Sequence, residues 1–325
     1  MNSTKLIPKA EIHVHLEATI APDLCKKFAK RNQVALPNDI FGDHYAYAWE
    51  DFYDFIKKYD VVTSVIHTPE DYSELTYNYL KECAENNVIY VEAMISSTHA
   101  KKKGMSYHSF LEGVVDGANQ AKKDFGIISK YIMNGIRHLG FESVHQTALE
   151  VLENPHIDLV GFGLAGDELH FPPNLFVKTF DMLKEAKFPI TVHAGEWDGP
   201  ENIRKAIELL HPTRLGHGVR SIEDLNLINY IKDKNIVLET CPTSNIATKI
   251  YNSYKDHPVK ELFDKGVKIT VNSDDPPFFN ASIAGEYEVM RSLGLNDEEL
   301  KSLTKNAIDS AFCKEEIKKE LLGKI

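Results

Sequence analysis

The amino-acid sequence predicts an α/β fold, a single (β/α)8 TIM-type barrel. Eight short apolar runs recur along the chain, and helical sequence follows each of them. Strict alternation of strand and helix is typical of a parallel sheet. The eight units occupy roughly 250 residues, the usual length of such a barrel. An open, doubly wound sheet is the alternative, but Gly161-Phe162-Gly163 lacks the third glycine of a dinucleotide-binding motif.

The expected strands are apolar runs, several of them β-branched and bounded by Gly, Pro or Asn. The first run alternates with period two, so His13 and His15 project to one face. In chain order the expected strands are 10–16, 88–94, 127–133, 159–164, 190–193, 214–217, 236–240 and 268–272.

Helices are expected from the spacing of apolar residues and from signals in the first turn. Pro22 and Asp23, for example, occupy the first turn of the first expected helix. The expected helices are 22–32, 71–86, 107–123, 143–154, 175–186, 200–210, 221–233 and 259–265, and an amphipathic helical tail begins at residue 297.

An insertion is expected after the first strand, because about seventy residues separate it from the second strand and a βα link needs far fewer. This inserted helical segment covers about 22–86, and its part 41–59 is rich in aromatic residues. It either caps a pocket as a lid or packs as ordinary core. No low-complexity linker divides the chain, so residues 1–325 are expected to form a single domain.

Composition narrows the classes of partner. The net charge is −11 and the only basic block is 101–103, which argues against nucleic-acid binding. No apolar run approaches the ~20 residues of a membrane helix. The four cysteines form no C-x-x-C pair, which suits a reducing cytosol. We therefore expect a cytoplasmic protein with a small-molecule ligand, no membrane contact and no evident protein partner.

Polar side chains gather where five of the expected strands end, and these ends meet at one mouth of a barrel. They are His13, His15 and Glu17, then 165–168, then His193 and Glu196, then His217, and finally 273–275. Alone, the H-x-H pattern could be the polar face of an edge strand, and His193-Ala194-Gly195-Glu196 could be chance. Burying several imidazoles and carboxylates together is costly unless they pair or bind a cation. Three histidines and one aspartate suit Zn²⁺.

Five motifs together resemble the signature set of the adenosine/adenine deaminase family. They are Pro8-Lys9-Ala10-Glu11-Ile12-His13-Val14-His15-Leu16, Leu164-Ala165-Gly166-Asp167-Glu168, His193-Ala194-Gly195-Glu196, Gly216-His217-Gly218 and Asn272-Ser273-Asp274-Asp275-Pro276. The resemblance implies a metal-dependent aminohydrolase with one Zn²⁺ per chain. Carried over by position, it implies that His13, His15, His193 and Asp274 bind the zinc and that His15 also faces the substrate.

The same resemblance implies roles for the other polar residues at these strand ends. Glu196 would protonate the purine nitrogen N1 beside the attacked carbon C6. His217 would orient the attacking hydroxide or act as its base, and Asp275 would bind N7 and contact the hydroxide. The Gly166 amide would bind N3, and Glu17 stands where adenosine deaminases place an aspartate that binds the ribose.

The motifs differ in the substrate that they indicate. Gly216 and the segment 164–168 resemble the adenosine branch of the family, whereas Glu17-Ala18 replaces the usual Asp-Gly and resembles adenine deaminases. The expected reaction, in purine salvage, is hydrolysis of adenosine and 2′-deoxyadenosine to inosine and 2′-deoxyinosine plus ammonia. Deamination of adenine to hypoxanthine is the alternative. A non-catalytic nucleoside-binding homologue and an amidohydrolase for another ring amine or amide are further alternatives.

Overall fold

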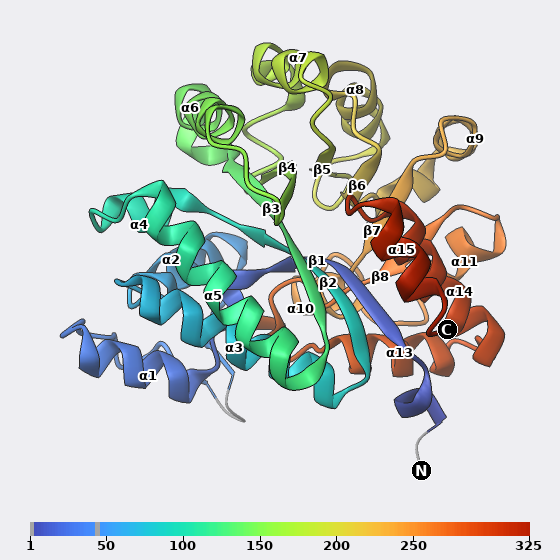
Figure 1. The fold of residues 1–325 in the computed structure, drawn as a ribbon. Helices are drawn as coiled ribbons and strands as arrows, with labels where there is room; N and C mark the ends of the chain where they lie inside the picture. Colours follow the sequence, from blue (N-terminus) through green and yellow to red (C-terminus); the bar gives the residue numbers. More distant parts are fainter. Residues whose placement is uncertain (1–2, 43–45) are drawn as a thin grey trace.

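Eight parallel strands form the centre of the computed structural model, which describes residues 3–42 and 46–325. The strands pair in chain order, and Figure 1 shows them inside a layer of helices. They are β1 (Lys9–His15), β2 (Val88–Ile95), β3 (Ile128–Ile136), β4 (Leu159–Ala165), β5 (Ile190–Ala194), β6 (Arg214–His217), β7 (Val237–Thr240) and β8 (Ile269–Val271). The His15 amide donates to the Asp274 carbonyl at 3.0 Å, just beyond β8, which closes the ring on β1. The predicted (β/α)8 barrel is confirmed.

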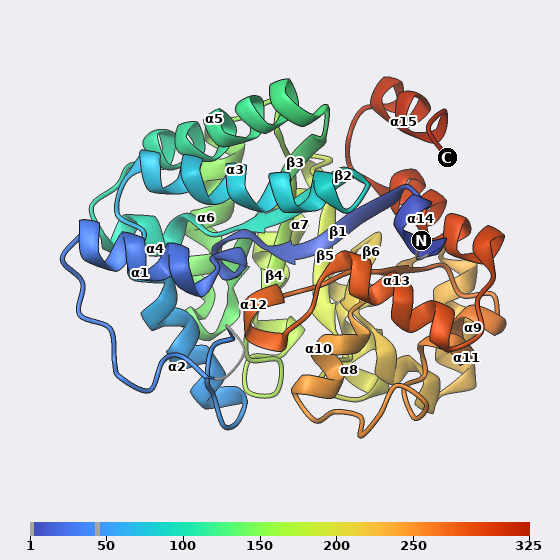
Figure 2. The same cartoon turned by 90° about the horizontal axis from the view of Figure 1, so that it is seen from below.

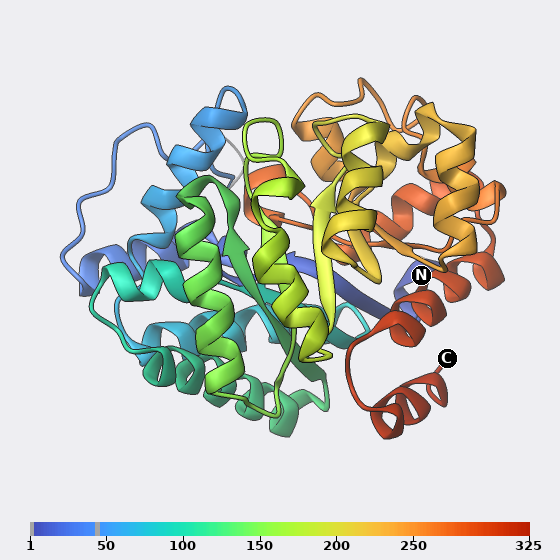
Figure 3. The ribbon, with the colours of Figure 1, turned by 90° about the horizontal axis from the view of Figure 1, so that it is seen from above.

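Helices cover the outside of the barrel, and Figure 3 shows α6, α7 and α8 (green to yellow) side by side. The described helices are α1 (Pro22–Arg31), α2 (Phe52–Thr63), α3 (Pro69–Glu85), α4 (Ser97–Lys102), α5 (Tyr107–Phe125), α6 (Gly140–Glu153), α7 (Val177–Glu185), α8 (Pro200–Leu210), α9 (Leu225–Asp233), α10 (Pro242–Ala247), α11 (Val259–Asp264), α12 (Pro276–Phe279), α13 (Ile283–Ser292), α14 (Asp297–Ser310) and α15 (Glu315–Leu322). Among these helices, none combines the length and apolar character needed to cross a membrane.

Local signals in the sequence set where several elements begin. The Thr68 hydroxyl accepts the Asp71 amide while the Asp71 carboxylate accepts the Thr68 amide, which completes a capping box at α3. The expected bounds of β6 and α8 coincide with the observed ones. Four helices were not expected, namely α4, α10, α12 and α13.

The segment 22–86 divides into two parts that do different things, apart from 43–45, which lie outside the described residues. Helix α3 packs against α5 and β2 in the outer layer (Figure 2). Helix α2 instead lies at the end of the barrel where the strands finish, and three of its aromatic side chains line a cavity there. The aromatic side chains of α2 therefore line the cavity and also pack against the hydrophobic core.

Candidate active site

Four polar side chains from three parts of the barrel converge at the carboxyl ends of the strands. His13 and His15 lie on β1, His193 on β5, and Asp274 just after β8. One donor atom from each lies within 4.8 Å of all the others, and the His15 and His193 Nε2 atoms are 3.3 Å apart. The predicted ligand set is therefore brought together, and its three nitrogens and one carboxylate oxygen suit a single divalent ion.

The state of the imidazoles fits metal binding. His13 Nε2 is buried and has no hydrogen-bond partner among the described residues, although Asp274 Oδ1 lies 3.4 Å away. Burial lowers the pKa of His15 to about 4 and puts that of His193 well below its usual value. Neutral imidazoles with a free lone pair are the form that binds a metal ion.

A second group could also surround an ion, with His217 and Cys241 joining His13 and Asp274. The Cys241 thiol donates to the Glu239 carbonyl at 3.6 Å, and burial raises its pKa well above the usual value. A thiol must lose its proton to bind zinc. The set with His15 and His193 is therefore the better candidate.

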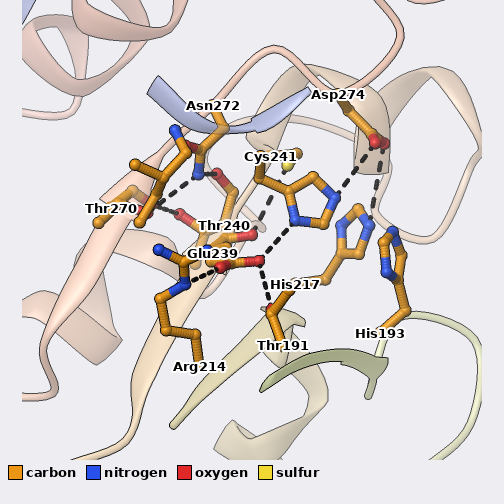
Figure 4. Close-up of polar contacts among 12 residues, drawn as sticks. Thr191, His193, Arg214, His217, Glu239, Thr240, Cys241, Thr270, Asn272 and Asp274 are labelled. Atoms are coloured by element: carbon orange, nitrogen blue, oxygen red, sulfur yellow. Dashed lines mark hydrogen bonds and ion pairs between the residues drawn. The ribbon is translucent and has the colours of Figure 1, made fainter. Parts of the chain in front are cut away.

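Buried charges hold the His13 ring in place, and Figure 4 shows the contacts of Glu239 with Arg214 and Thr191. The His13 Nδ1–H donates to Glu239 Oε2 at 2.8 Å, which turns Nε2 toward the cluster. The same oxygen accepts the Thr191 hydroxyl at 3.0 Å, while Arg214 Nε is 2.6 Å from Glu239 Oε1. Despite its burial, Arg214 and His13 keep the pKa of Glu239 below its usual value, so it is a carboxylate. Such a partner fixes the tautomer of a metal-binding histidine.

Glu196 lies on the loop after β5, and a second glutamate fixes that loop. Glu168 accepts backbone N–H groups from Gly195 at 2.5 Å, Glu196 at 3.2 Å and Trp197 at 3.1 Å. Burial, with the nearby Asp274 and Glu168 carboxylates, raises the pKa of Glu196 well above its usual value. The surroundings of Glu196, which lines the cavity, therefore favour its protonated form.

Asp275 and His217 complete the polar wall of the cavity. Burial raises the pKa of Asp275 well above its usual value, and its Oδ1 has no hydrogen-bond partner among the described residues. Burial lowers the pKa of His217 to about 3, so its ring is neutral. His217 Nε2 lies 3.6 Å from Glu196 Oε2 and 3.8 Å from Asp274 Oδ2.

Gly166 lines the cavity, whereas Glu17 does not. Gly166 lines the cavity with φ of +103°, and a Cβ there would lie 2.6 Å from His138 Nδ1, so only glycine fits. Glu17 is buried behind the cavity wall, where its carboxylate accepts the Ser96 amide at 2.9 Å. The structure therefore brings together seven of the predicted residues on one wall, namely His15, Gly166, His193, Glu196, His217, Asp274 and Asp275. His13 lies behind them.

An apolar roof faces this polar wall. Phe52, Phe55 and Tyr59 of α2 line the cavity together with Phe279 of α12. The Phe52 ring packs on Trp197, with centroids 4.6 Å apart, which ties α2 to the loop that carries Glu196. The cavity can therefore hold a flat ring between aromatic side chains and the polar wall.

Several supporting residues were missed by reasoning from the sequence. Ser244 donates to Asp274 Oδ2 at 2.7 Å, and Glu168 and Glu239 act as described above. Glu239 and Arg214 gave one usable signal, since each is a charged residue within an expected buried strand. Ser244 gave none, because a serine in a short segment after a strand is common.

The fold and its sequence match known deaminases along the whole chain. Adenine deaminase from Arthrobacter aurescens superposes with a TM-score of 0.91 at 29% identity, covering 98% of this chain and 97% of that one. An amidohydrolase from Burkholderia ambifaria with bound zinc superposes with a TM-score of 0.88 at 25% identity, covering 98% and 89%. A solved structure with the same barrel fold thus holds zinc.

Sequence relatives correct the expected substrate. Adenine deaminase from Sinorhizobium medicae is 40% identical over 321 residues, which cover 98% of both chains. Adenine deaminase from Agrobacterium fabrum is 40% identical over 323 residues, or 99% of both. The expectation of adenosine as substrate is therefore wrong. Of the conflicting motifs, Glu17-Ala18 was the informative one, because the Glu17 carboxylate is already bound to the Ser96 amide.

A family model described as adenosine deaminase matches residues 8–325. That range holds all five motifs and the whole barrel, from β1 to the helices after β8. The chain belongs to the adenosine deaminase family of hydrolytic deaminases.

Proposed function

We propose that this chain hydrolyses adenine to hypoxanthine and ammonia. The observation that carries the proposal is the 40% identity, over nearly the full length of both chains, to proteins named adenine deaminase. The site supports it, because a protonated acid, a neutral imidazole and a ligand set for one metal ion face an aromatic roof. Adenine has no ribose, so the buried Glu17 has no sugar to bind.

Zinc is the proposed metal, held by His13, His15, His193 and Asp274. When bound, it lowers the pKa of water to about 7 and so supplies a nucleophile at neutral pH. The carboxylates around His13 favour a cation there, since Asp274 and Glu239 raise its pKa to about 10 despite its burial.

The acid groups of the chain act on the purine ring. Glu196, protonated because of its raised pKa, donates to N1 and makes the neighbouring C6 more electrophilic. Asp275, also protonated, donates to N7, and the Gly166 amide donates to N3. His15 faces the ring edge, while His217 orients the attacking water. Water adds at C6, the C6–amine bond breaks, and ammonia leaves with the proton that it gains.

The surrounding residues exclude water and position the base. Phe52, Phe55 and Tyr59 cover the ring, so that competing water does not solvate Glu196. A reducing compartment such as the cytoplasm is the proposed location, because Cys25, Cys83, Cys241 and Cys313 are all buried free thiols.

A panel of substrates tests the proposal. The zinc-loaded protein is incubated with adenine, adenosine, 2′-deoxyadenosine, AMP and guanine, and ammonia release is measured. We expect adenine to have a kcat/KM at least ~100-fold above every other substrate, as expected where the site excludes a larger ligand.

The Glu196→Gln variant is the control, because it keeps the shape of the side chain but removes its acidic proton. Its kcat on adenine should fall by ~10²–10⁴-fold with zinc content unchanged. No release of ammonia from adenine by the zinc-loaded protein, or a preference for a nucleoside, would refute the proposal.

A further inference from the structure

We propose that Asn245 and His257 are positioning residues that hold His217 as the neutral imidazole with its proton on Nε2. In that form His217 is a hydrogen-bond donor to the attacking water and not its base. This inference rests on the proposed function for the identity of the reaction, but the tautomer itself can be measured without a substrate.

The chain of hydrogen bonds starts at a group that can only donate. The backbone N–H of Val259, at the start of α11, donates to His257 Nδ1 at 3.1 Å. His257 Nδ1 must therefore carry a lone pair, and its neutral ring has the proton on Nε2. Burial favours this neutral ring, since it lowers the pKa of His257 to about 3.

Asn245 passes this orientation on to His217. His257 Nε2 lies 3.0 Å from Asn245 Oδ1, so it donates to the amide oxygen. The amide nitrogen Nδ2 is then turned to His217 Nδ1, at 3.3 Å, and an amide NH₂ can only donate. His217 Nδ1 is thus an acceptor, which leaves the proton of the neutral ring on Nε2.

The chain of hydrogen bonds from His257 through Asn245 to His217 is rigid, because these residues are buried and held by contacts with the backbone. His257 and His217 are 3% and 1% exposed, and Asn245 is fully buried. The Asn245 carbonyl accepts the amides of Ile250 at 3.0 Å and Tyr251 at 3.2 Å, and the Tyr251 ring packs edge-on against His257. The amide of Asn245 cannot rotate without leaving a buried group unpaired.

The other side of the ring selects the same tautomer independently. His217 Nε2 faces two oxygens, Glu196 Oε2 at 3.6 Å and Asp274 Oδ2 at 3.8 Å. The Asp274 carboxylate selects the tautomer, because a lone pair on Nε2 would face the lone pairs of Oδ2, whereas an N–H is attracted to that oxygen. In the proposed reaction the attacking water therefore meets a donor at His217, and its proton passes to Glu196, which is a carboxylate once it has protonated N1.

Nuclear magnetic resonance of the zinc-loaded enzyme reads the tautomer directly. The protein is labelled with ¹⁵N-histidine, and long-range ¹H–¹⁵N spectra are assigned with the His217→Gln and His257→Gln variants. We expect both rings to show a protonated Nε2 and an unprotonated Nδ1. A proton on Nδ1 of His217 in the wild type would overturn the inference, whatever the substrate proves to be.

Asn245→Asp tests the consequence for activity. Aspartate offers only acceptors, so it moves the His217 proton to Nδ1 and turns a lone pair toward the water. We expect the spectrum to change in this way and kcat to fall at least ~10-fold at unchanged zinc content. An Asn245→Asp enzyme with the switched tautomer and wild-type kcat would refute the donor role.

Two further variants separate positioning from folding. His257→Gln keeps an N–H near the position of Nε2 and should retain the tautomer and most of kcat, whereas His257→Leu should lose both. Asn78→Asp, the same change at an exposed site on α3, should alter neither. If Asn245→Asp does not fold, the His257 pair and the wild-type spectrum still decide the matter.

Discussion

Glu239 fixes the ring of His13, a proposed zinc ligand. Its carboxylate also accepts the Thr191 hydroxyl and forms an ion pair with Arg214. Glu239→Gln keeps the volume of the side chain but removes the charge that stabilises the His13 Nδ1–H donor. Loss of such a partner weakens metal affinity by ~10–100-fold, and we expect a decrease in that range. Competition with a chromophoric chelator measures the affinity.

Glu85→Gln, on the exposed side of α3, serves as the control for this change. Its zinc affinity should equal that of the wild type. If Glu239→Gln also binds zinc as the wild type does, the buried carboxylate does not support the metal site.

Glu286 is a buried acid outside the cavity, and it predicts a pH effect on stability. The Thr243 amide donates to its Oε1 at 3.2 Å, Oε2 has no partner within residues 3–42 and 46–325, and burial raises its pKa to about 8. The unfolded chain ionises this group near its usual pKa of 4.5, so the folded state loses stability as the pH rises from there to about 8. Each unit of raised pKa costs about 1.4 kcal/mol.

Glu286→Gln removes this ionisation. The variant should have a higher free energy of unfolding than the wild type at about pH 9, with the difference shrinking toward about pH 5. Urea denaturation at both pH values measures it. Parallel pH dependence in the two proteins would show that Glu286 ionises freely in the folded state.

Helix α2 turns an ordinary barrel into a covered site, because Phe52, Phe55 and Tyr59 form the roof. Phe52→Ala removes apolar area that contacts the base, and burial of one such side chain is worth about 1.5–3 kcal/mol. We expect KM for adenine to rise at least ~10-fold with a smaller change in kcat. Steady-state kinetics measures KM and kcat. The control is Lys57→Ala, at an exposed position on the same helix, which should leave both unchanged. A fall in kcat at unchanged KM would contradict a binding role.

Most strands and long helices could be predicted from the sequence. Each buries one face, and the spacing of its apolar residues indicates that face. Helices α10 and α12 could not, since they have six and four residues and follow a strand end like any loop. The covering of the cavity by α2 is a tertiary arrangement that no local pattern encodes.

The predicted site residues sit in motifs of fixed spacing, which is why the sequence could indicate them. Their supports, such as Asn245 and His257, act through contacts between segments and have no motif of their own. The substrate was misjudged because Gly216 and Gly166 concern backbone space near the metal and the ring, which both purine substrates need. Glu17 differs from these glycines, because its buried carboxylate already accepts the Ser96 amide.

The metal site joins the two edges of the sheet, since β1 supplies two of the proposed ligands and the residue after β8 supplies another. Binding to the folded state alone stabilises by about 4 kcal/mol at a metal concentration 1,000 times Kd. Removing the metal with a chelator should therefore lower Tm by several degrees and abolish activity, and added zinc should restore both. Differential scanning calorimetry of both forms measures the shift, and an unchanged Tm would contradict a metal shared between β1, β5 and β8.

The hydrogen bond from the His15 amide to the Asp274 carbonyl joins segments far apart in the sequence, which leave the ribosome at different times. At about 5–20 residues per second, the early strand waits many seconds for the segment that closes the ring. During that time the nascent protein has only part of its coordination sphere and no covered pocket. Capture of zinc and the onset of turnover should thus coincide with the arrival of the segment after β8, so truncated translation products would neither sequester the ion nor consume the base.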